Sequence, residues 1–361
     1  MKIAYIGGTY VPSRGADSVH IMNICEAMAD LGHDVTLYAR PGPEPASNDY
    51  SFYGVKPNFR IVKHSRPQVR GWGAFANAAL VARHVRSHAL PDLLYAREQY
   101  GLAFSVGCGV PFALESHWKP RYALQRETEG WLFRRPNFRR LVVISEGLRK
   151  IYRDLFPWLP PERIVVAHDA ANPSMQSVQV KSSSSNRLQV GYVGGMLPGY
   201  GIDVIVSIAK ANPELDMHVV GGSSEAILSW QTRAFGVRNL TFHGFVEPRS
   251  LASFYDRFDV VLAPFQRDTP SILWISPMKL FEYMAYGKAI VCSDFPIMRE
   301  ILSDQVTALL VPADNIGAWS AALARLADRS LREQLGRAAL ARLRQEHTWR
   351  HRAERVLADL P

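Results

Sequence analysis

The chain of 361 residues is long for one hydrophobic core and comfortable for two domains of common size. With 47% hydrophobic and 21% charged residues, its composition is that of a globular protein and excludes the disordered and fibrous classes. No apolar run reaches the roughly 18 residues that span a bilayer. The N-terminal apolar run is also short, so neither a membrane-spanning helix nor a signal peptide is expected.

The three cysteines are too few and too scattered for a disulfide framework or a zinc site. Cys25 and Cys292 lie in apolar runs and are expected to be buried thiols, which favours a reducing cytoplasmic location. The formal net charge of +9 is unevenly spread. Ten basic and three acidic residues lie between Lys119 and Arg153, so that stretch alone carries 10 − 3 = +7.

The first half of the chain alternates short β-rich runs with helical runs. Strands are expected at Lys2–Ile6, Asp34–Ala39, Asp92–Tyr95, Pro111–Leu114, Leu141–Ile144 and Ile164–Ala167. Between the first two strands, apolar residues from Val19 to Leu31 recur at helical spacing, and Gly32 ends that helix. Alternating strands and helices predict a parallel sheet that is covered on both faces.

A polar stretch centred on Ser182–Ser185 is expected to be a linker over residues 173–187. A second alternating series follows, with strands expected at Leu188–Val193, Asp216–Val220, Leu240–His243, Val260–Ala263, Ala289–Cys292 and Ala308–Val311. The tail from Ala313 is expected to be helical. The sequence therefore predicts two α/β domains, over residues 1–172 and 188–345.

The segment that begins at Ser276 has the features of a helix start directed at an anion. Ser276 suits the N-cap and Pro277 the first helical position, so the N–H groups of Met278 and Lys279 would point toward a phosphate. Lys279 and Glu282 share a helix face, so a diphosphate could meet Lys279 while Glu282 accepts two ribose hydroxyls. The alternative is a capped amphipathic helix whose Lys279–Glu282 pair contributes about 0.2–0.5 kcal/mol. The spacing alone leaves both interpretations open.

The run Ser276–Ala285, followed by Gly287–Asp294 and Arg299–Glu300, resembles the donor-site signature of family-4 glycosyltransferases of group 1. These are retaining enzymes that use nucleotide sugars and have the GT-B fold, two Rossmann-like α/β domains whose parallel sheets face each other across a cleft. The resemblance covers most of the chain and is strongest over residues 240–301. It implies an N-terminal acceptor-binding domain, a C-terminal donor-binding domain, and a last helix, 346–361, that crosses back to the N-terminal domain.

Two glycine-containing loops correspond to loops that the family places at the donor. The first, Gly7–Asp17, contains Gly15, which the resemblance places facing the donor phosphates. The second, Gly194–Gly201, contains Gly195. Glycine permits close backbone approach to a phosphate or sugar. From spacing alone, the glycines at the start of the first loop are better explained as turn residues.

The second loop departs from the family pattern. The family places an Arg and a Lys where this chain has Met196 and Tyr200, so two cations that neutralise the diphosphate are missing. Lys279, the helix start and Arg14 are left to neutralise the diphosphate.

The family also tends to carry a Glu near the donor sugar, at the position where this chain has Trp274. Sugar recognition is therefore expected to use other groups. The candidates are the backbone of residues 272–275, the side chain of Asp268, and the ring of Trp274 stacked on an apolar sugar face.

The strand and loop Thr241–Val246 resemble the family segment that reads the nucleotide base through main-chain groups. His243 lies at the strand end, Gly244 would permit close approach, and Val246 would supply backbone contacts. An ordinary strand end is the alternative.

His117 follows an expected strand and matches the His that the family places at the cleft, near the acceptor and the donor sugar. An imidazole there can hydrogen-bond a sugar hydroxyl or assist a departing proton. Arg97, Glu98 and Glu115 also resemble subfamily positions. They are expected to be structural, with a place on the acceptor side as the alternative.

The basic stretch 119–153 interleaves arginines with large apolar side chains. These side chains are Trp118, Tyr122, Trp131, Leu132, Phe133 and Phe138. Such a surface suits an anionic membrane, where each basic residue adds about 1 kcal/mol. A solvated helix face is the close alternative. Nucleic acid is the least favoured partner, because no nucleic-acid motif is present.

No Asp-x-Asp triplet and no His/Cys cluster with ligand spacing occurs in the sequence, so no metal or other cofactor is expected. The candidate catalytic residues are Lys279 and Glu282, from the helix motif, and His117, from the resemblance.

The prediction is a retaining glycosyltransferase, with retention implied by the resemblance. It would move a sugar from a nucleotide-diphosphate donor to a glycan, lipid-linked or small-molecule acceptor, in cell-surface polysaccharide or glycoconjugate biosynthesis. It is expected in the cytoplasm, with peripheral contact at the inner face of the membrane. Two alternatives remain open. One is a nucleotide-sugar 2-epimerase, against which the missing Glu at Trp274 argues. The other is a catalytically silent sugar-nucleotide-binding protein, motivated by the departures from the family pattern.

Overall fold

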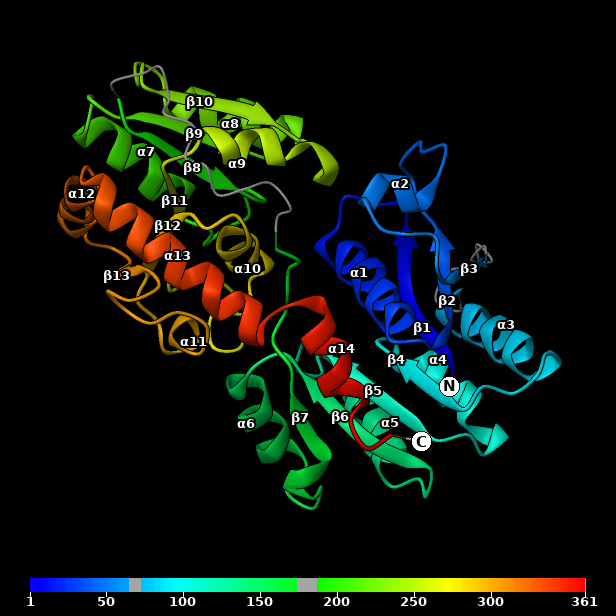
Figure 1. Ribbon diagram of the computed structural model, residues 1–361. Helices are drawn as coiled ribbons and strands as arrows, with labels where there is room; N and C mark the ends of the chain where they lie inside the picture. The colour runs from blue at the N-terminus through cyan, green and yellow to red at the C-terminus, as the bar shows by residue number, and fades with distance from the viewer. Residues whose placement is uncertain (65–72, 174–186, 361) are drawn as a thin grey trace. The chain divides into compact units, whose positions relative to one another are not determined.

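The computed structural model describes residues 1–64, 73–173 and 187–360. The chain divides into two compact units, the first formed by Met1–Asp169 with Trp349–Pro361 and the second by Ala170–Thr348. Figure 1 shows each unit as a sheet with helices on its faces. Apart from its two end residues, the linker predicted at 173–187 lies outside the described residues.

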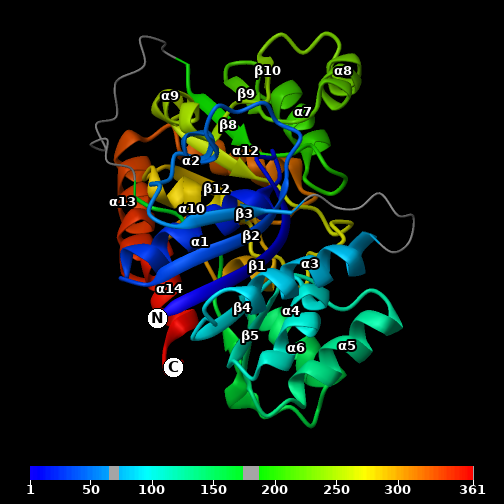
Figure 2. The same cartoon turned by 90° about the vertical axis from the view of Figure 1, so that its right-hand side faces the viewer.

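The first unit is built on a seven-stranded parallel sheet with the strand order β3-β2-β1-β4-β5-β6-β7. Its strands are β1 (Lys2–Val11), β2 (Asp34–Pro41), β3 (Arg60–Lys63), β4 (Leu93–Ala96), β5 (Phe112–Ser116), β6 (Phe138–Val143) and β7 (Ile164–Val166). Figure 2 shows β3, β2, β1, β4 and β5 in this succession. The strands β4 and β5 are buried along their whole length, as expected of a parallel sheet covered on both faces.

Helices follow the strands of the first unit. They are α1 (Ala16–Asp30), α2 (Asp49–Tyr53), α3 (Gly73–Ser87), α4 (Gln99–Ser105), α5 (Ala123–Phe133), α6 (Glu146–Leu155) and α14 (Trp349–Leu357), with short 3-10 turns at Val106–Cys108 and Pro161–Arg163. The last helix, α14, packs along α1, so the end of the chain becomes part of the first unit.

The first strand is longer than the sequence indicates. The predicted strand ended at Ile6 and a loop was expected from Gly7, but β1 continues to Val11. The extension pairs Tyr10 with Arg40 after a shift of register. The loop prediction was wrong at this point because Tyr10 and Val11 pair with β2 again beyond the irregularity, where Gly8 has a left-handed φ of 64°.

The second unit contains a six-stranded parallel sheet with the order β10-β9-β8-β11-β12-β13. Its strands are β8 (Gln189–Val193), β9 (Asp216–Val220), β10 (Leu240–Gly244), β11 (Val260–Ala263), β12 (Ala289–Ser293) and β13 (Leu309–Val311). Its helices are α7 (Ile202–Ala211), α8 (Ser224–Arg233), α9 (Ala252–Arg257), α10 (Met278–Ala285), α11 (Pro296–Arg299), α12 (Ile316–Arg325) and α13 (Arg329–Glu346), with a 3-10 turn at Pro248–Ser250.

In both sheets the order of the strands reverses once, between β1 and β4 in the first and between β8 and β11 in the second. Open α/β sheets bind ligands beyond the strand ends at this point. In the second unit the loops after β8 and β11 are tied together there. Gly199 O accepts hydrogen bonds from Gln266 N and Thr269 Oγ1, both at 2.7 Å.

Cys25 and Cys292 are buried free thiols, as predicted. Among the residues that the structure describes, no helix is long and apolar enough to cross a membrane.

Gly201 has no room for a side chain. Its φ of 76° is left-handed, and a Cβ would lie 1.8 Å from Pro264 O. We expect Gly201→Ala to lower the free energy of unfolding by about 1 kcal/mol for the φ alone and by about 1–3 kcal/mol more for the forced backbone shift. Gly236 is the matched control, because its φ is 84° but nothing lies within 4 Å of its Cβ position. Equal losses for the two variants in urea titrations would contradict the close approach.

Candidate functional site

The helix α10 is fixed to the strand ends at the reversal point of the second sheet. Val193 N donates to Tyr283 Oη at 3.0 Å, and this hydroxyl donates to Leu262 O at 3.1 Å. Leu280 and Phe281, on the inner face of the helix, are fully buried. One tyrosine thus joins α10 to the ends of β8 and β11, and this contact places the start of α10 at the sheet's ligand-binding edge.

The helix begins one residue later than the sequence suggested. Pro277 is the N-cap, with extended backbone, and its carbonyl accepts from Leu280 N at 3.0 Å. The prediction of Ser276 as N-cap and Pro277 as first helical residue was therefore wrong. The chain stays extended through Pro277, and Ser276 is a buried residue before the helix. Among the described residues, no acceptor meets the N–H groups of Met278 and Lys279.

The ammonium group of Lys279 lies in an aromatic box. Its Nζ donates to Tyr192 Oη at 2.7 Å and lies 4.0 Å from the centre of that ring. The rings of Phe265 and Tyr200 lie 4.9 and 5.0 Å away. Within the described parts of the chain, Lys279 forms no salt bridge. Its direct contacts in those parts are ring faces and one hydroxyl.

Burial lowers the pKa of Lys279 to about 7, although Glu282 and Cys292 oppose the shift. Glu282 has its own partner, since Tyr255 donates to its Oε2 at 3.0 Å. Burial raises the pKa of Glu282, against the hydrogen bond from Tyr255 and the charge of Lys279. The two side chains therefore do not form the simple surface pair of a capped amphipathic helix. A perturbed pair at a ligand-binding edge, with Lys279 buried and Glu282 half-buried, is a functional-site signal.

The loop after β8 contains the two positions where this chain lacks the expected cations. Tyr200 packs its ring against Lys279 and against Phe265, whose ring centre is 5.2 Å away. Met196 is buried with the apolar core of the unit. Gly195 O accepts from Tyr192 Oη at 2.5 Å, so Gly195 supports the ring that holds Lys279.

The loop before α10 forms its own turn. The N–H groups of Ile272, Trp274 and Ile275 donate to Thr269 O or Ser271 O at 2.8–3.0 Å. Three of the backbone donors suggested for sugar recognition are thus already used. Trp274 is buried, with 6% of its surface exposed, so its ring offers little area for stacking on a sugar.

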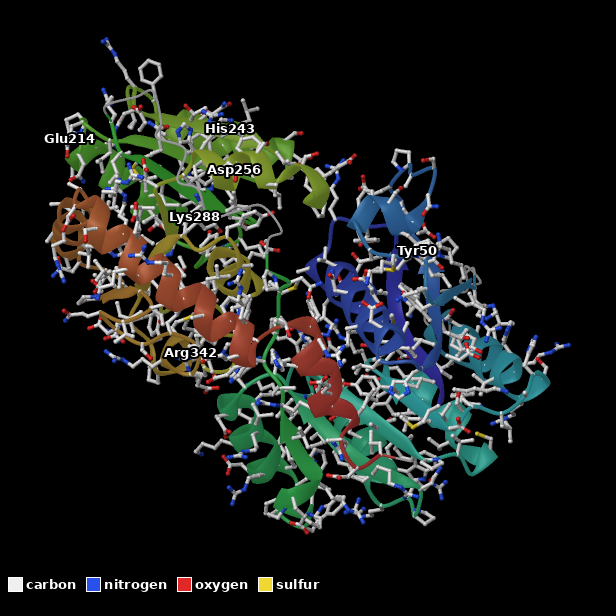
Figure 3. All side chains as sticks on the ribbon, in the orientation of Figure 1. Tyr50, Glu214, His243, Asp256, Lys288 and Arg342 are labelled. Carbon is white, nitrogen blue, oxygen red and sulfur yellow. The ribbon has the colours of Figure 1, made fainter. Side chains whose placement is uncertain are left out.

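The segment expected at the nucleotide base lies at the end of β10. His243 Nε2 is 3.1 Å from His218 Nδ1, and the His243 ring packs edge-on against Phe254 of α9. Figure 3 labels His243 in the second unit. Gly244 has a left-handed φ of 78°, and Val246 packs against the unit's core. Gly244 thus requires glycine for its backbone, independently of any ligand.

In the first unit, Gly15 is the N-cap of α1, and its carbonyl accepts from Ser18 N at 3.1 Å. The neighbouring Arg14 forms an ion pair with Glu44 at 3.0 Å. Glu98 caps α4, accepting from Tyr100 N at 2.9 Å, which fits the expected structural role.

His117 lies immediately after β5, in a buried polar network that the sequence did not indicate. Its Nε2 is 2.5 Å from Glu115 Oε1, and Arg352 Nη2 donates to the same oxygen at 2.8 Å. His20 lies between this carboxylate and Asp169, with its Nδ1 2.8 Å from Asp169 Oδ1. His20, Asp169 and Arg352 come from distant parts of the chain, so no local motif could have indicated them.

Family models match both halves of the chain. Residues 18–174 match "Glycosyltransferase Family 4" and residues 187–329 match "Glycosyl transferases group 1". The chain belongs to the GT-B glycosyltransferases of group 1. The predicted fold class and the predicted enzyme class, glycosyltransferase, are thereby confirmed.

Similar proteins agree with this assignment. The alpha-maltose-1-phosphate synthase of Mycolicibacterium smegmatis is 23% identical over 99% of this chain and 98% of that protein. The "Putative teichuronic acid biosynthesis glycosyltransferase TuaH" of Bacillus subtilis is 22% identical, but the match spans only 54% of this chain and 55% of that protein. The crystal structure of Anabaena Alr3699/HepE in complex with UDP has a TM-score of 0.75 at 14% identity, covering 99% of this chain and 98% of that one.

Among the residues that the structure describes, one group has metal-ligand geometry. His20, Glu115 and His117 each offer an atom within 4.8 Å of the others. However, Arg352 already lies on the Glu115 oxygen that a metal would need. The guanidinium supplies the positive charge there, so these residues suit an internal ion network better than a metal.

The low pKa of Lys279 predicts a pH dependence for donor use. The ammonium form, which would bind a diphosphate, is lost as pH rises through about 7 in the free enzyme. We expect kcat/KM for a nucleotide sugar to fall above that pH, approaching about tenfold per pH unit, because kcat/KM reports ionisations of the free enzyme.

Lys288→Met is the control for this profile. Lys288 is another lysine whose pKa burial lowers, and its Nζ donates to Phe258 O at 2.9 Å (labelled in Figure 3). The fall should persist in this variant. A wild-type profile that stays level to pH 9 would show that Lys279 does not control donor use.

Proposed function

We propose that this glycosyltransferase transfers a sugar, with retention of anomeric configuration, from a nucleotide-diphosphate donor bound at α10. The observation that carries the proposal is the buried ammonium of Lys279 beside two helix-start N–H groups that no acceptor among the described residues meets. A buried cation that forms no salt bridge among the described residues opposes folding. Its presence at a helix N-terminus is explained by an anionic ligand that the helix dipole also favours.

In this proposal Lys279 and the amides of Met278 and Lys279 stabilise the negative charge that develops on the leaving diphosphate. Glu282 accepts the ribose hydroxyls, and Gly195 and Gly15 leave room for the phosphates. His243, Gly244 and Val246 lie at the nucleotide base. Ser276, Pro277 and Trp274 shape the loop that leads into the helix.

UDP is the first nucleotide to test, because structures of Anabaena Alr3699/HepE contain UDP and UDP-glucose. The acceptor is proposed to be a glycan, a lipid-linked sugar or a small molecule. The name of the Bacillus relative refers to teichuronic acid biosynthesis, which supports a role in cell-surface polysaccharide or glycoconjugate synthesis. We propose that no metal takes part, since lysine and backbone amides supply the positive potential.

Two other functions give different outcomes in the same assays. A nucleotide-sugar 2-epimerase would convert the donor to its epimer without any acceptor. A catalytically silent sugar-nucleotide-binding protein would bind the donor in calorimetry and neither transfer nor hydrolyse it across an acceptor panel. The departures from the family pattern at Met196, Tyr200 and Trp274 are the reason for testing these alternatives.

The test is Lys279→Met, assayed with UDP-, GDP-, ADP- and dTDP-sugars, with and without EDTA. Loss of the cation should reduce kcat/KM by about 10²–10³-fold, the cost of removing one charge-stabilising donor. EDTA should leave wild-type turnover unchanged. Wild-type kcat/KM in the variant would remove Lys279 from the mechanism, and loss of activity in EDTA would contradict the metal-free proposal.

The same variant should be more stable than the wild type. A lysine whose pKa is about 7 in the folded protein, against an ordinary value of 10.5, opposes folding. This cost is fully present below about pH 7 and is relieved as pH rises toward 10.5. At neutral pH we expect the variant to gain about 1–4 kcal/mol in free energy of unfolding, as buried charges replaced by apolar groups do. Urea titration measures this gain, and a variant less stable than the wild type would contradict it.

The basic stretch 119–153 is proposed to contact an anionic membrane, which would place the protein at the cytoplasmic face of that membrane. Three exposed tryptophans lie under arginines: Trp118 under Arg121, Trp131 under Arg135 and Trp158 under Arg134, at 4.5, 3.8 and 4.0 Å. Leu132, Phe133 and Phe138 are buried core residues, so counting them in this surface was wrong. Their side chains lie in the interior of the first unit, where the rings of Phe133 and Phe138 pack together.

Arg121→Gln with Arg135→Gln tests the membrane contact, because both arginines are exposed. In sedimentation with phosphatidylglycerol vesicles, the lost charges should weaken binding by roughly 30-fold, at about 1 kcal/mol for each. Arg325→Gln with Arg344→Gln removes two exposed arginines of the second unit and should have no effect. Equal binding by all three proteins, or none by the wild type, would refute the contact.

A further inference from the structure

Glu115 is the centre of the buried network in the first unit. Both of its oxygens are engaged: Oε1 by Arg352 and His117, and Oε2 by the hydroxyl of Tyr95. Its side chain is fully buried, as is that of Arg352. Burial would raise the pKa of Glu115, but the charges of Arg352 and His20 hold the pKa well below its ordinary value. Glu115 is therefore an ionised carboxylate, which can only accept hydrogen bonds.

This charge determines which nitrogen of His117 carries the proton. Because Glu115 Oε1 can only accept, His117 Nε2 must be the donor across their 2.5 Å contact. Burial, with the positive charge of Arg97, lowers the pKa of His117 to about 3, so the ring is neutral at physiological pH. A neutral imidazole protonated at Nε2 has a bare Nδ1, which can accept a hydrogen bond from a hydroxyl.

We infer that Glu115 is a positioning residue that holds His117 as the Nε2–H tautomer, so that Nδ1 accepts a hydrogen bond from a sugar hydroxyl during transfer. This inference rests on the proposed function, in which His117 meets the donor or acceptor sugar. It also selects between the two roles that an imidazole offers there. A ring that holds a second proton so weakly is suited to accept a hydrogen bond, and poorly suited to collect a departing proton.

Arg352 of α14 supports Glu115 in this role. Its Nη1 donates to the carbonyls of Ala167 and His168, and its Nη2 donates to Glu115 Oε1 at 2.8 Å. The guanidinium is thus fixed at three points and keeps the carboxylate ionised. The last helix of the chain therefore takes part in preparing His117, beyond completing the fold of the first unit.

Further titratable neighbours of the pair among the described residues come from separate elements. His20 of α1 is 3.0 Å from Glu115 Oε1, and its ring lies edge-on to His117 with centres 4.8 Å apart. On the other side of His20, Asp169 accepts a hydrogen bond from its Nδ1. The ring centre of Trp349, in α14, lies 5.0 Å from that of His20. Burial would raise the pKa of Asp169, but the hydrogen bond and charge of His20 lower it to about 2.

The direct test is the protonation of His117 by ¹⁵N NMR of the ring nitrogens at pH 7. In the wild type, we expect a protonated Nε2 and a bare Nδ1. A ring protonated at Nδ1, or at both nitrogens, would overturn the inference. This measurement needs no activity, so it is independent of whether the proposed transfer reaction is correct.

The kinetic test is the double variant Glu115→Gln with Arg352→Met, which removes both buried charges together and avoids leaving one unpaired. A glutamine amide can donate to His117, so the tautomer should become mixed. We expect kcat to fall about 10–100-fold, the range that a histidine's outer partners contribute at metal sites. KM for the nucleotide sugar should be unchanged, because the diphosphate is proposed to bind in the second unit.

Two further variants separate positioning from folding. Arg352→Lys, with Glu115 intact, keeps both buried charges. Its kcat should be higher than that of the double variant. Glu26→Gln changes a buried carboxylate on α1 that bonds Lys56 N at 2.8 Å, and it should leave both kcat and the His117 spectrum unchanged. A double variant that is folded and turns over like the wild type would refute the role of Glu115. A wild type that transfers no sugar would instead refute the proposed function.

Discussion

The ammonium group of Lys279 is buried among aromatic rings, and the ligand-binding edge of the second unit is built around it. Tyr192 holds it by a hydrogen bond and a ring face, and Tyr283 fixes α10 to the ends of β8 and β11. The described part of the chain gives Lys279 no salt bridge, so its charge is only partly compensated. A diphosphate would complete that compensation, which is why the site is expected to favour an anion.

The departures from the family pattern acquire a physical meaning in this arrangement. Tyr200 occupies the position of an expected lysine, and its ring is one wall of the box around Lys279. Met196, in place of an arginine, joins the buried core beneath the loop. The loop after β8 and the helix α10 together thus offer one cation, Lys279, where the pattern has several. Aromatic walls hold a lysine without neutralising it, whereas a second cation nearby would repel it.

The sequence predicted the strands of both sheets well, because buried parallel strands are continuous apolar runs between helices. It missed β3 and the extension of β1 to Val11, where pairing with β2 decides the conformation. It also placed the start of α10 one residue early. The motif around Lys279 and Glu282 was visible because its residues are neighbours on one helix.

The network around His117 was not visible in the same way. Glu115 and Arg352 are 237 positions apart, and His20 and Asp169 are 149 apart. Only the tertiary fold brings them together, through the packing of α14 along α1. Sequence reasoning could find His117 from its place after a strand, but not the groups that set its proton.

Calorimetric titration with UDP-glucose at pH 8, in two buffers of different ionisation enthalpy, tests the account most directly. Above the pKa of Lys279, much of the lysine is uncharged in the free protein. Binding of a diphosphate beside it should draw a proton from the buffer, with uptake approaching one proton for each donor bound, and Lys279→Met should abolish that uptake. Tight binding without any proton uptake in the wild type would contradict the claim that the ammonium group of Lys279 binds the diphosphate.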